Sequence, residues 1–201
     1  VGNENPTNLV HVINTATNSL ITTIPVGSAP YGISVSPDGS KVYAANFSSS
    51  NVSVINVATN TVITTIPVAA EPWGTSYSLD GSKLYLGHQS SGTVDVIATA
   101  TNTVTTSISV GSDPYLVALN PGGTKLFVSD RNNGNVHVVN TATNTVSATI
   151  PGFNKAAGIS FSTDGTKAYV ANQGSNNVSI LNTATNTITG SILVGATPYA
   201  V

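Results

Sequence analysis

Residues 51–68 read NVSVINVATNTVITTIPV, and the whole chain of 201 residues repeats the pattern of this stretch. Valines mark the repeat at intervals of 42 residues, with no insertion or deletion, at Val10, Val52, Val94, Val136 and Val178. Asparagines keep the same register at Asn18, Asn60, Asn102, Asn144 and Asn186. A fixed period of this length indicates a repeat architecture in which each copy forms one supersecondary unit.

Each period contains four short runs of β-type residues separated by turn sequences. In one copy the runs are 31–36 (YGISVS), 41–46 (KVYAAN), 52–56 (VSVIN) and 61–68 (TVITTIPV). Asn60 and the stretch 37–40 (PDGS) suit tight turns, because Asn and Gly tolerate a left-handed backbone. Val, Ile and Thr favour strands over helices. Four antiparallel strands per period predict an all-β fold of β-propeller blades, with a β-solenoid as the alternative.

The ends of the chain determine how many blades we expect. Four blades are complete, at about residues 30–68, 72–110, 114–152 and 156–194. A fifth would combine residues 1–26 with a last strand from residues 198–201, which closes the ring and removes exposed sheet edges. We therefore expect a single five-bladed propeller domain over residues 1–201. The alternative is a fragment of a longer propeller with more blades.

The second run of each period carries a resemblance to a known family. Tyr169-Val170-Ala171-Asn172 resembles the Y-V-T-N signature of the YVTN-family β-propeller repeats, and Tyr43-Ala44-Ala45-Asn46 is a looser copy. Residues 85–88 (YLGH) and 127–130 (FVSD) keep only the aromatic start. The likeness extends over essentially the whole chain. It implies a propeller of the kind typical of archaeal and bacterial surface-layer and secreted proteins, and it implies no catalytic activity.

The composition indicates a weakly charged protein located outside the cell or at its surface. Charged residues make up only 7% of the chain, against ~25% in ordinary soluble domains, and the formal net charge is −2. Such a surface gives no electrostatic basis for binding nucleic acid, and no apolar run approaches the ~20 residues of a membrane-spanning helix. A surface rich in Thr, Ser and Asn favours an extracellular or cell-surface location. Candidate N-glycosylation sequons lie at Asn46, Asn51 and Asn177.

Aromatic residues recur at one connector position of the repeat. They are Tyr31, Trp73, Tyr115 and Tyr199, with Ala157 as the exception. One interpretation is an aromatic ring at the mouth of the axial channel, suited to stacking a sugar or holding a peptide. The other is that each aromatic side chain fills the gap between neighbouring blades.

Residues that break the register are further candidates for binding. His88, Asp130, Arg131 and Lys155 stand where other copies carry different side chains. A site for one ligand should differ between blades, although drift in exposed loops is the alternative. Cysteine is absent and His11, His88 and His137 do not cluster along the chain, so we expect neither a metal nor a cofactor.

These features favour a non-catalytic structural or recognition module of a cell surface, for example in a surface layer, sheath or filament. The expected partners are other surface proteins or glycans, with self-association and without nucleic acid or membrane insertion. Two alternatives remain. One is an axial-channel glycosidase or lyase using carboxylates such as Glu71, Asp113 and Asp130. The other is a sugar-binding, lectin-like propeller.

Overall fold

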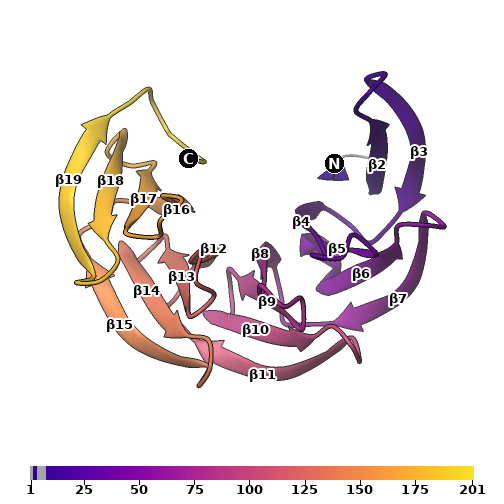
Figure 1. Cartoon of the computed structure of the whole chain (residues 1–201), viewed down its shortest axis with the longest axis horizontal. Coiled ribbons are helices and arrows are strands. Elements are labelled where there is room, and N and C mark those ends of the chain that lie inside the picture. The colour runs from indigo at the N-terminus through magenta and orange to yellow at the C-terminus, as the bar shows by residue number, and fades with distance from the viewer. Residues whose placement is uncertain (1, 4–7) are drawn as a thin grey trace. The chain divides into compact units, whose positions relative to one another are not determined.

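The computed structural model describes residues 2–3 and 8–201, whose regular elements are antiparallel strands and one short 3-10 helix (Figure 1). The first sheet has the order β1 (Gly2–Asn3), β2 (Leu9–Asn14), β3 (Ser19–Pro25). The second has the order β4 (Pro30–Val35), β5 (Lys41–Asn46), β6 (Asn51–Asn56), β7 (Thr61–Pro67), with the 3-10 helix η1 (Phe47–Ser49) between β5 and β6.

The remaining three sheets repeat this four-stranded meander. The third contains β8 (Pro72–Tyr77), β9 (Lys83–His88), β10 (Thr93–Ala98) and β11 (Thr103–Ser109). The fourth contains β12 (Pro114–Leu119), β13 (Lys125–Asp130), β14 (Asn135–Asn140) and β15 (Thr145–Pro151). The fifth contains β16 (Ala156–Phe161), β17 (Lys167–Asn172), β18 (Asn177–Asn182) and β19 (Thr187–Leu193). The predicted all-β class and the 42-residue, four-stranded repeat are thus confirmed.

The chain divides into two compact units. The first comprises residues up to 91 together with 95–106, and the second comprises 92–94 together with 107–201. The first unit contains the first two sheets and most of the third, and the second contains the fourth and fifth.

The turns form as their residues predict. The asparagines between the last two strands of each sheet all adopt a left-handed backbone, with φ between 53° and 55°, at Asn18, Asn60, Asn102, Asn144 and Asn186. In the preceding hairpin of the second sheet, the Asp38 carboxylate accepts hydrogen bonds from the Ser40 N–H (3.0 Å) and the Ser36 hydroxyl. These bonds lower the pKa of Asp38 to about 2. Asp80 and Asp164 act in the same way in later copies.

The first sheet differs from the predicted fifth blade. It has three strands, and residues 198–201 belong to no strand. The Tyr199 carbonyl instead accepts a hydrogen bond from the N–H of Gly158 in β16, at 2.9 Å. Completion of the first sheet by the C-terminal residues is therefore not observed. Residue 1 and residues 4–7, which belong to the predicted first blade, lie outside the described residues, and the blade boundaries stay a prediction.

Apolar cores form between consecutive sheets. In the second unit, Ile150 of β15 is packed with Val136 and Val138 of its own sheet and with Val170 and Leu181 of the next. In the first unit, Ile66 of β7 lies in an equivalent cluster with Leu84 and Leu86 of β9. Both faces of such a sheet are therefore apolar, which explains the imperfect polar alternation of its strands.

The isoleucine of the outer strand shows how much this packing matters. Ile24, Ile66, Ile108 and Ile150 are 3–6% exposed, whereas the equivalent Ile192 of β19 is 50% exposed. Ile150→Ala should therefore lower the free energy of unfolding by about 2–4 kcal/mol, because it leaves a cavity. Ile192→Ala should cost less than about 1 kcal/mol. Both substitutions lose the same β-strand propensity. The difference between their free energies of unfolding, measured by urea denaturation, therefore reports the contribution of packing. Equal losses would contradict the packing scheme.

A partly buried hydrogen bond joins neighbouring sheets in the first unit, and the equivalent residues of the second unit do not form it. The hydroxyl of Tyr43 donates to Asn102 Oδ1 at 2.5 Å. The equivalent residues of the second unit are Phe127 and Asn186, and the buried Oδ1 of Asn186 has no hydrogen-bond partner among the described residues. Phe127 meets Phe161 edge-to-face, as Tyr43 meets Tyr77, so the two ring environments match.

Phe127→Tyr should therefore raise the free energy of unfolding by about 1 kcal/mol, because the new hydroxyl reaches Asn186 Oδ1. Phe161→Tyr is the matched control, since the buried hydroxyl of the equivalent Tyr77 has no hydrogen-bond partner within residues 2–3 and 8–201. The control should give no gain in thermal or denaturant unfolding. A destabilised Phe127→Tyr protein would show that the two ring environments differ.

Candidate functional site

A buried polar pair recurs where the second strand of a sheet ends. In the second sheet, Asn46 Nδ2 donates to Ser53 Oγ at 2.9 Å, and in the fifth, Asn172 Nδ2 donates to Ser179 Oγ at 2.8 Å. All four side chains are buried. At this position of the repeat, the pair in both sheets is therefore an amide hydrogen-bonded to a hydroxyl.

The third and fourth sheets replace this pair with histidine and aspartate, in opposite orders. In the third sheet, His88 Nε2 lies 2.9 Å from Asp95 Oδ2, and both side chains are buried. In the fourth, the aspartate comes first, and Asp130 Oδ2 lies 3.4 Å from His137 Nε2. Spacings of seven residues thus join complementary partners in every four-stranded sheet.

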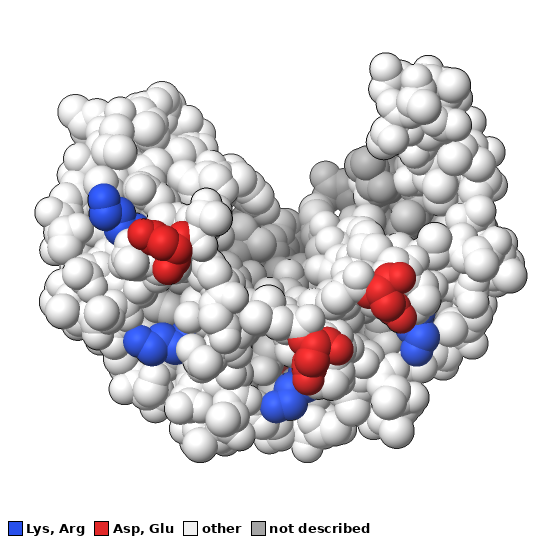
Figure 2. Space-filling view, viewed as in Figure 1, with Lys and Arg blue, Asp and Glu red and all other residues white. Residues whose placement is uncertain are grey.

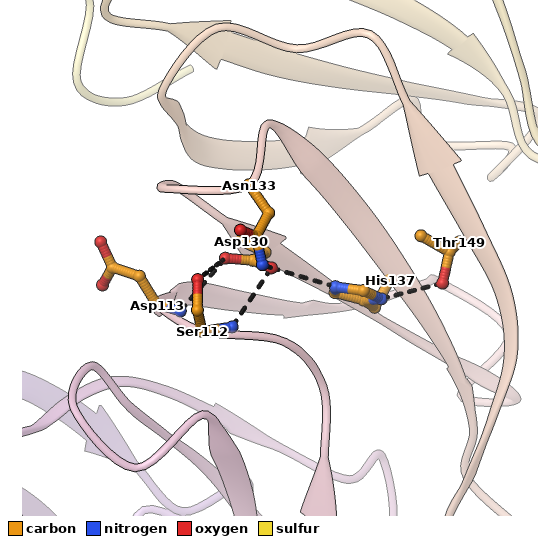
Figure 3. A network of polar contacts seen from close by, with 6 residues as sticks. All are labelled: Ser112, Asp113, Asp130, Asn133, His137 and Thr149. Carbon is orange, nitrogen blue, oxygen red and sulfur yellow. Dashed lines mark hydrogen bonds and ion pairs between the residues drawn. The ribbon is translucent and has the colours of Figure 1, made fainter.

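Asp130 holds the surrounding loops together (Figure 3). Its carboxylate accepts hydrogen bonds from Asn133 Nδ2 (2.8 Å) and from the backbone N–H groups of Ser112 (3.3 Å) and Asp113 (3.1 Å). One fully buried side chain therefore fixes both the connector before β12 and the loop after β13. The carboxylate is engaged on both oxygens, so it serves the framework of the site.

Hydrogen bonding outweighs burial in setting the charge of Asp130. Burial alone would raise the pKa of this carboxyl, but hydrogen bonds from Asn133, His137 and two backbone N–H groups hold the pKa below its ordinary value. The ionised group therefore stabilises the fold above the unfolded-state pKa, and this contribution is lost as the pH falls.

His137 continues the chain of contacts toward the surface. Its Nδ1 lies 3.0 Å from Oγ1 of Thr149, which is exposed on β15. An aspartate, a histidine and a hydroxyl in line resemble an acid–base relay. However, a hydroxyl occupies this position in every copy of the repeat, at Thr23, Thr65, Ser107, Thr149 and Ser191. The hydroxyl therefore belongs to the repeat rather than to a special feature of the fourth sheet.

Asp130→Asn should lower the free energy of unfolding by about 2–3 kcal/mol, because a buried, charged acceptor of several hydrogen bonds is lost. The double variant Asp130→Asn/His137→Ser recreates the Asn–Ser pair of the second and fifth sheets. It should be more stable than the sum of the two single changes predicts, by about 1 kcal/mol or more. Additive losses in this double-mutant cycle would contradict the pairing.

The loop after β13 and the connector before β16 enclose a shallow depression of about 260 Å³. Its lining residues are Arg131, Asn132, Asn133, Gly134, Phe153, Asn154 and Lys155. Four of the six basic residues of the chain occupy one repeated position, the first residue of the strand that follows a turn, at Lys41, Lys83, Lys125 and Lys167. The two basic residues outside that position, Arg131 and Lys155, both line this depression.

The connector of the depression departs from the repeat for a packing reason. Other copies read Val-Gly or Val-Ala here, as at Val110 and Gly111, whereas this copy reads Gly152 and Phe153. Phe153 is buried in the core cluster of the second unit, so the apolar side chain has moved one position along. Gly152 adopts φ +102°, a conformation that L side chains rarely adopt. The rearranged connector presents Asn154 and Lys155, both exposed.

Arg131 is held in place by an aromatic ring. Its guanidinium lies over the Tyr115 ring, 5.0 Å from the centroid, and its backbone N–H donates to the Asp113 carbonyl. The Tyr115 hydroxyl donates to the Tyr199 hydroxyl at 2.8 Å. Burial and this contact raise the pKa of Tyr115. The structure thus brings three predicted site residues, Arg131, Tyr115 and Tyr199, into one contact chain.

The other two predicted aromatics contact each other in the first unit. Tyr31 stacks on Trp73 with a centroid separation of 4.0 Å, and Phe47 meets both rings edge-on. One face of each stacked ring is therefore covered, which supports the gap-filling interpretation for this pair. Tyr31 remains 40% exposed. His88, a predicted binding candidate, is buried against Asp95.

The predicted glycosylation sites differ in their surroundings. Asn46 is fully buried, and its amide donates to both Asn51 Oδ1 and Ser53 Oγ. A glycan has no room there, so the folded protein corrects the prediction at Asn46. Asn51 and Asn177 are half-buried at strand starts and remain candidates.

Charge is sparse on the face of the molecule seen in Figure 2, where acidic and basic groups form small islands on an uncharged surface. Within residues 2–3 and 8–201, no three His, Asp or Glu side chains are grouped so that they could hold a metal ion. None of the helical segments described is long and apolar enough to cross a membrane.

Several residues of the site escape a reading of the sequence. Asp95 and His137 are partners of predicted residues, and Asn133 lines the depression. The signal for the first two is present: they lie seven residues after His88 and Asp130, as Ser53 follows Asn46. The connector at residues 151–157 departs from the repeat in sequence, but nothing in the sequence signals that it meets the loop at residues 131–134, because that depends on the fold.

Comparisons with known proteins identify the fold and nothing narrower. No model of a known protein family matches the chain, and no curated protein matches it. Hydrazine synthase from Kuenenia stuttgartiensis is similar in structure, with a TM-score of 0.87 and 22% identity over 96% of this chain and 62% of that one. A functionally unknown protein from Desulfotomaculum acetoxidans DSM 771 also gives 0.87, with 16% identity over 96% of this chain and 65% of that one.

The chain thus spans less than two thirds of the length of both structures. These matches, with the repeated antiparallel sheets, support a propeller-like fold. In total 1373 chains of known structure match, and a fold this widespread carries many functions.

Proposed function

We propose that this protein is a non-catalytic, extracellular or cell-surface propeller that recognises surface glycans. The observation that carries the proposal is the depression of the second unit, where Arg131 and Lys155 meet three asparagines on a framework of packed sheets. Rigid strands support the loops, so little conformational entropy is lost when a partner binds.

Composition and resemblance support the location. A surface rich in Thr, Asn and Ser and poor in charge suits close packing against a cell-surface layer, because little repulsion opposes approach. The resemblance of residues 169–172 (YVAN) to the YVTN signature of surface-layer and secreted proteins agrees with this location. Membership of that family is part of the proposal.

The surroundings of Asp130 disfavour the enzyme alternative. Asp130, one of the carboxylates considered for a hydrolase, is buried and bonded to His137, Asn133 and backbone N–H groups. A glycosidase carboxylate must instead face the sugar. The observed contacts therefore favour binding over hydrolysis.

Affinity electrophoresis through soluble polysaccharides tests the proposal. The protein should be retarded by at least one polysaccharide in a panel of neutral and acidic types, without generating new reducing ends or unsaturated products. Bovine serum albumin in the same gels controls for non-specific retardation. Appearance of products would establish an enzyme, and no retardation by any polysaccharide would reject glycan recognition.

A further inference from the structure

We propose that the depression lined by Arg131 and Lys155 binds the carboxylate-bearing sugar of an acidic glycan, namely a uronate residue. This inference rests on the proposed glycan recognition and specifies its ligand. It follows from the charge, the hydrogen-bonding groups and the size of the depression.

The charge of the depression is positive. Its lining includes two cations and no carboxylate. Neither Arg131 nor Lys155 forms an ion pair in the part of the chain that the structure describes. Asp130, next to Arg131, is buried and faces its own donors. The two cations are therefore available to an anion, and the planar fork of Arg matches a carboxylate.

The neutral groups of the lining suit hydroxyls. Asn132, Asn133 and Asn154 are exposed, and each side-chain amide offers both a donor and an acceptor. A sugar ring presents neighbouring hydroxyls that can use both. A volume of about 260 Å³ lies just below the ~300 Å³ at which drug-sized pockets begin, which suits one ring.

The backbone of the depression argues against a peptide strand. The Phe153 N–H donates to the Gly134 carbonyl, the Gln173 N–H to the Lys155 carbonyl, and the Gly174 N–H to the Asn154 carbonyl. The backbone N–H of Arg131 also donates a hydrogen bond, to the Asp113 carbonyl. Peptides that extend a sheet depend on unpaired main-chain groups. Recognition here must come from side chains, which favours a ligand rich in hydroxyls and carboxylate.

The site is preorganised at one cation and adaptable at the other. The Tyr115 ring and the anchored loop hold the Arg131 guanidinium, so its binding costs little side-chain entropy. Lys155 has a left-handed backbone, φ +54°, and an exposed side chain. We therefore expect Arg131 to fix the carboxylate and Lys155 to strengthen its binding.

Isothermal titration of the 201-residue chain with trigalacturonate and with neutral galactotriose tests the assignment. The wild-type protein should bind trigalacturonate more tightly than the neutral sugar. Arg131→Gln and Lys155→Gln should each weaken trigalacturonate binding about 10-fold, because each removes a charge-assisted hydrogen bond. Lys167→Gln removes the same charge from the exposed start of β17 in the same unit and should leave the affinity unchanged.

Each other outcome has a defined meaning. Equal binding of the two trisaccharides would leave glycan recognition standing and overturn the uronate assignment. If Lys167→Gln weakened trigalacturonate binding as much as Arg131→Gln and Lys155→Gln do, the effect would come from net charge alone. That result would overturn the proposed site. Binding of triglutamate as tight as that of trigalacturonate, and lost in Arg131→Gln, would show an acidic peptide partner instead. Failure of the wild-type chain to bind any glycan would overturn this inference together with the proposed function.

Discussion

Face-to-face packing between consecutive sheets is the constraint on which the rest of this structure depends. Each copy of the repeat is too small to bury its own apolar residues, so an outer-strand isoleucine such as Ile150 is covered by the strands of the next sheet. Both faces of a sheet must then stay apolar, and polar variation is confined to turns, connectors and strand ends. The function has to be sought at those positions.

The strand-end pairs show how the repeat accommodates polarity beside an apolar core. Asn46 with Ser53 is a neutral pair, whereas Asp130 with His137 can also anchor neighbouring loops, because a carboxylate accepts more hydrogen bonds than an amide oxygen. Replacing one pair by the other keeps the sheet and alters the loops around it. In the fourth sheet this replacement coincides with the shifted apolar residue Phe153 and with the two cations of the depression.

The fold could be predicted from the sequence far more fully than the site. The strand Lys41–Asn46 occurs in four copies and the left-handed Asn60 in five, so each copy supports the prediction for the others. Pairing of His88 with Asp95 needs knowledge of which strand faces which, and burial of the sequon residue Asn46 depends on the same register. The meeting of Arg131 with Lys155 depends on two loops 24 residues apart, which no local pattern encodes.

The most direct measurement is a map of backbone amide chemical shifts on titration with trigalacturonate. If the register-breaking loops of the second unit form the binding site, the largest shifts will lie at residues 131–134 and 153–155, with small shifts in the apolar strands. Shifts concentrated around Tyr31 and Trp73 would place binding at the aromatic cluster of the first unit. That result would contradict the assignment of recognition to the Arg131–Lys155 depression.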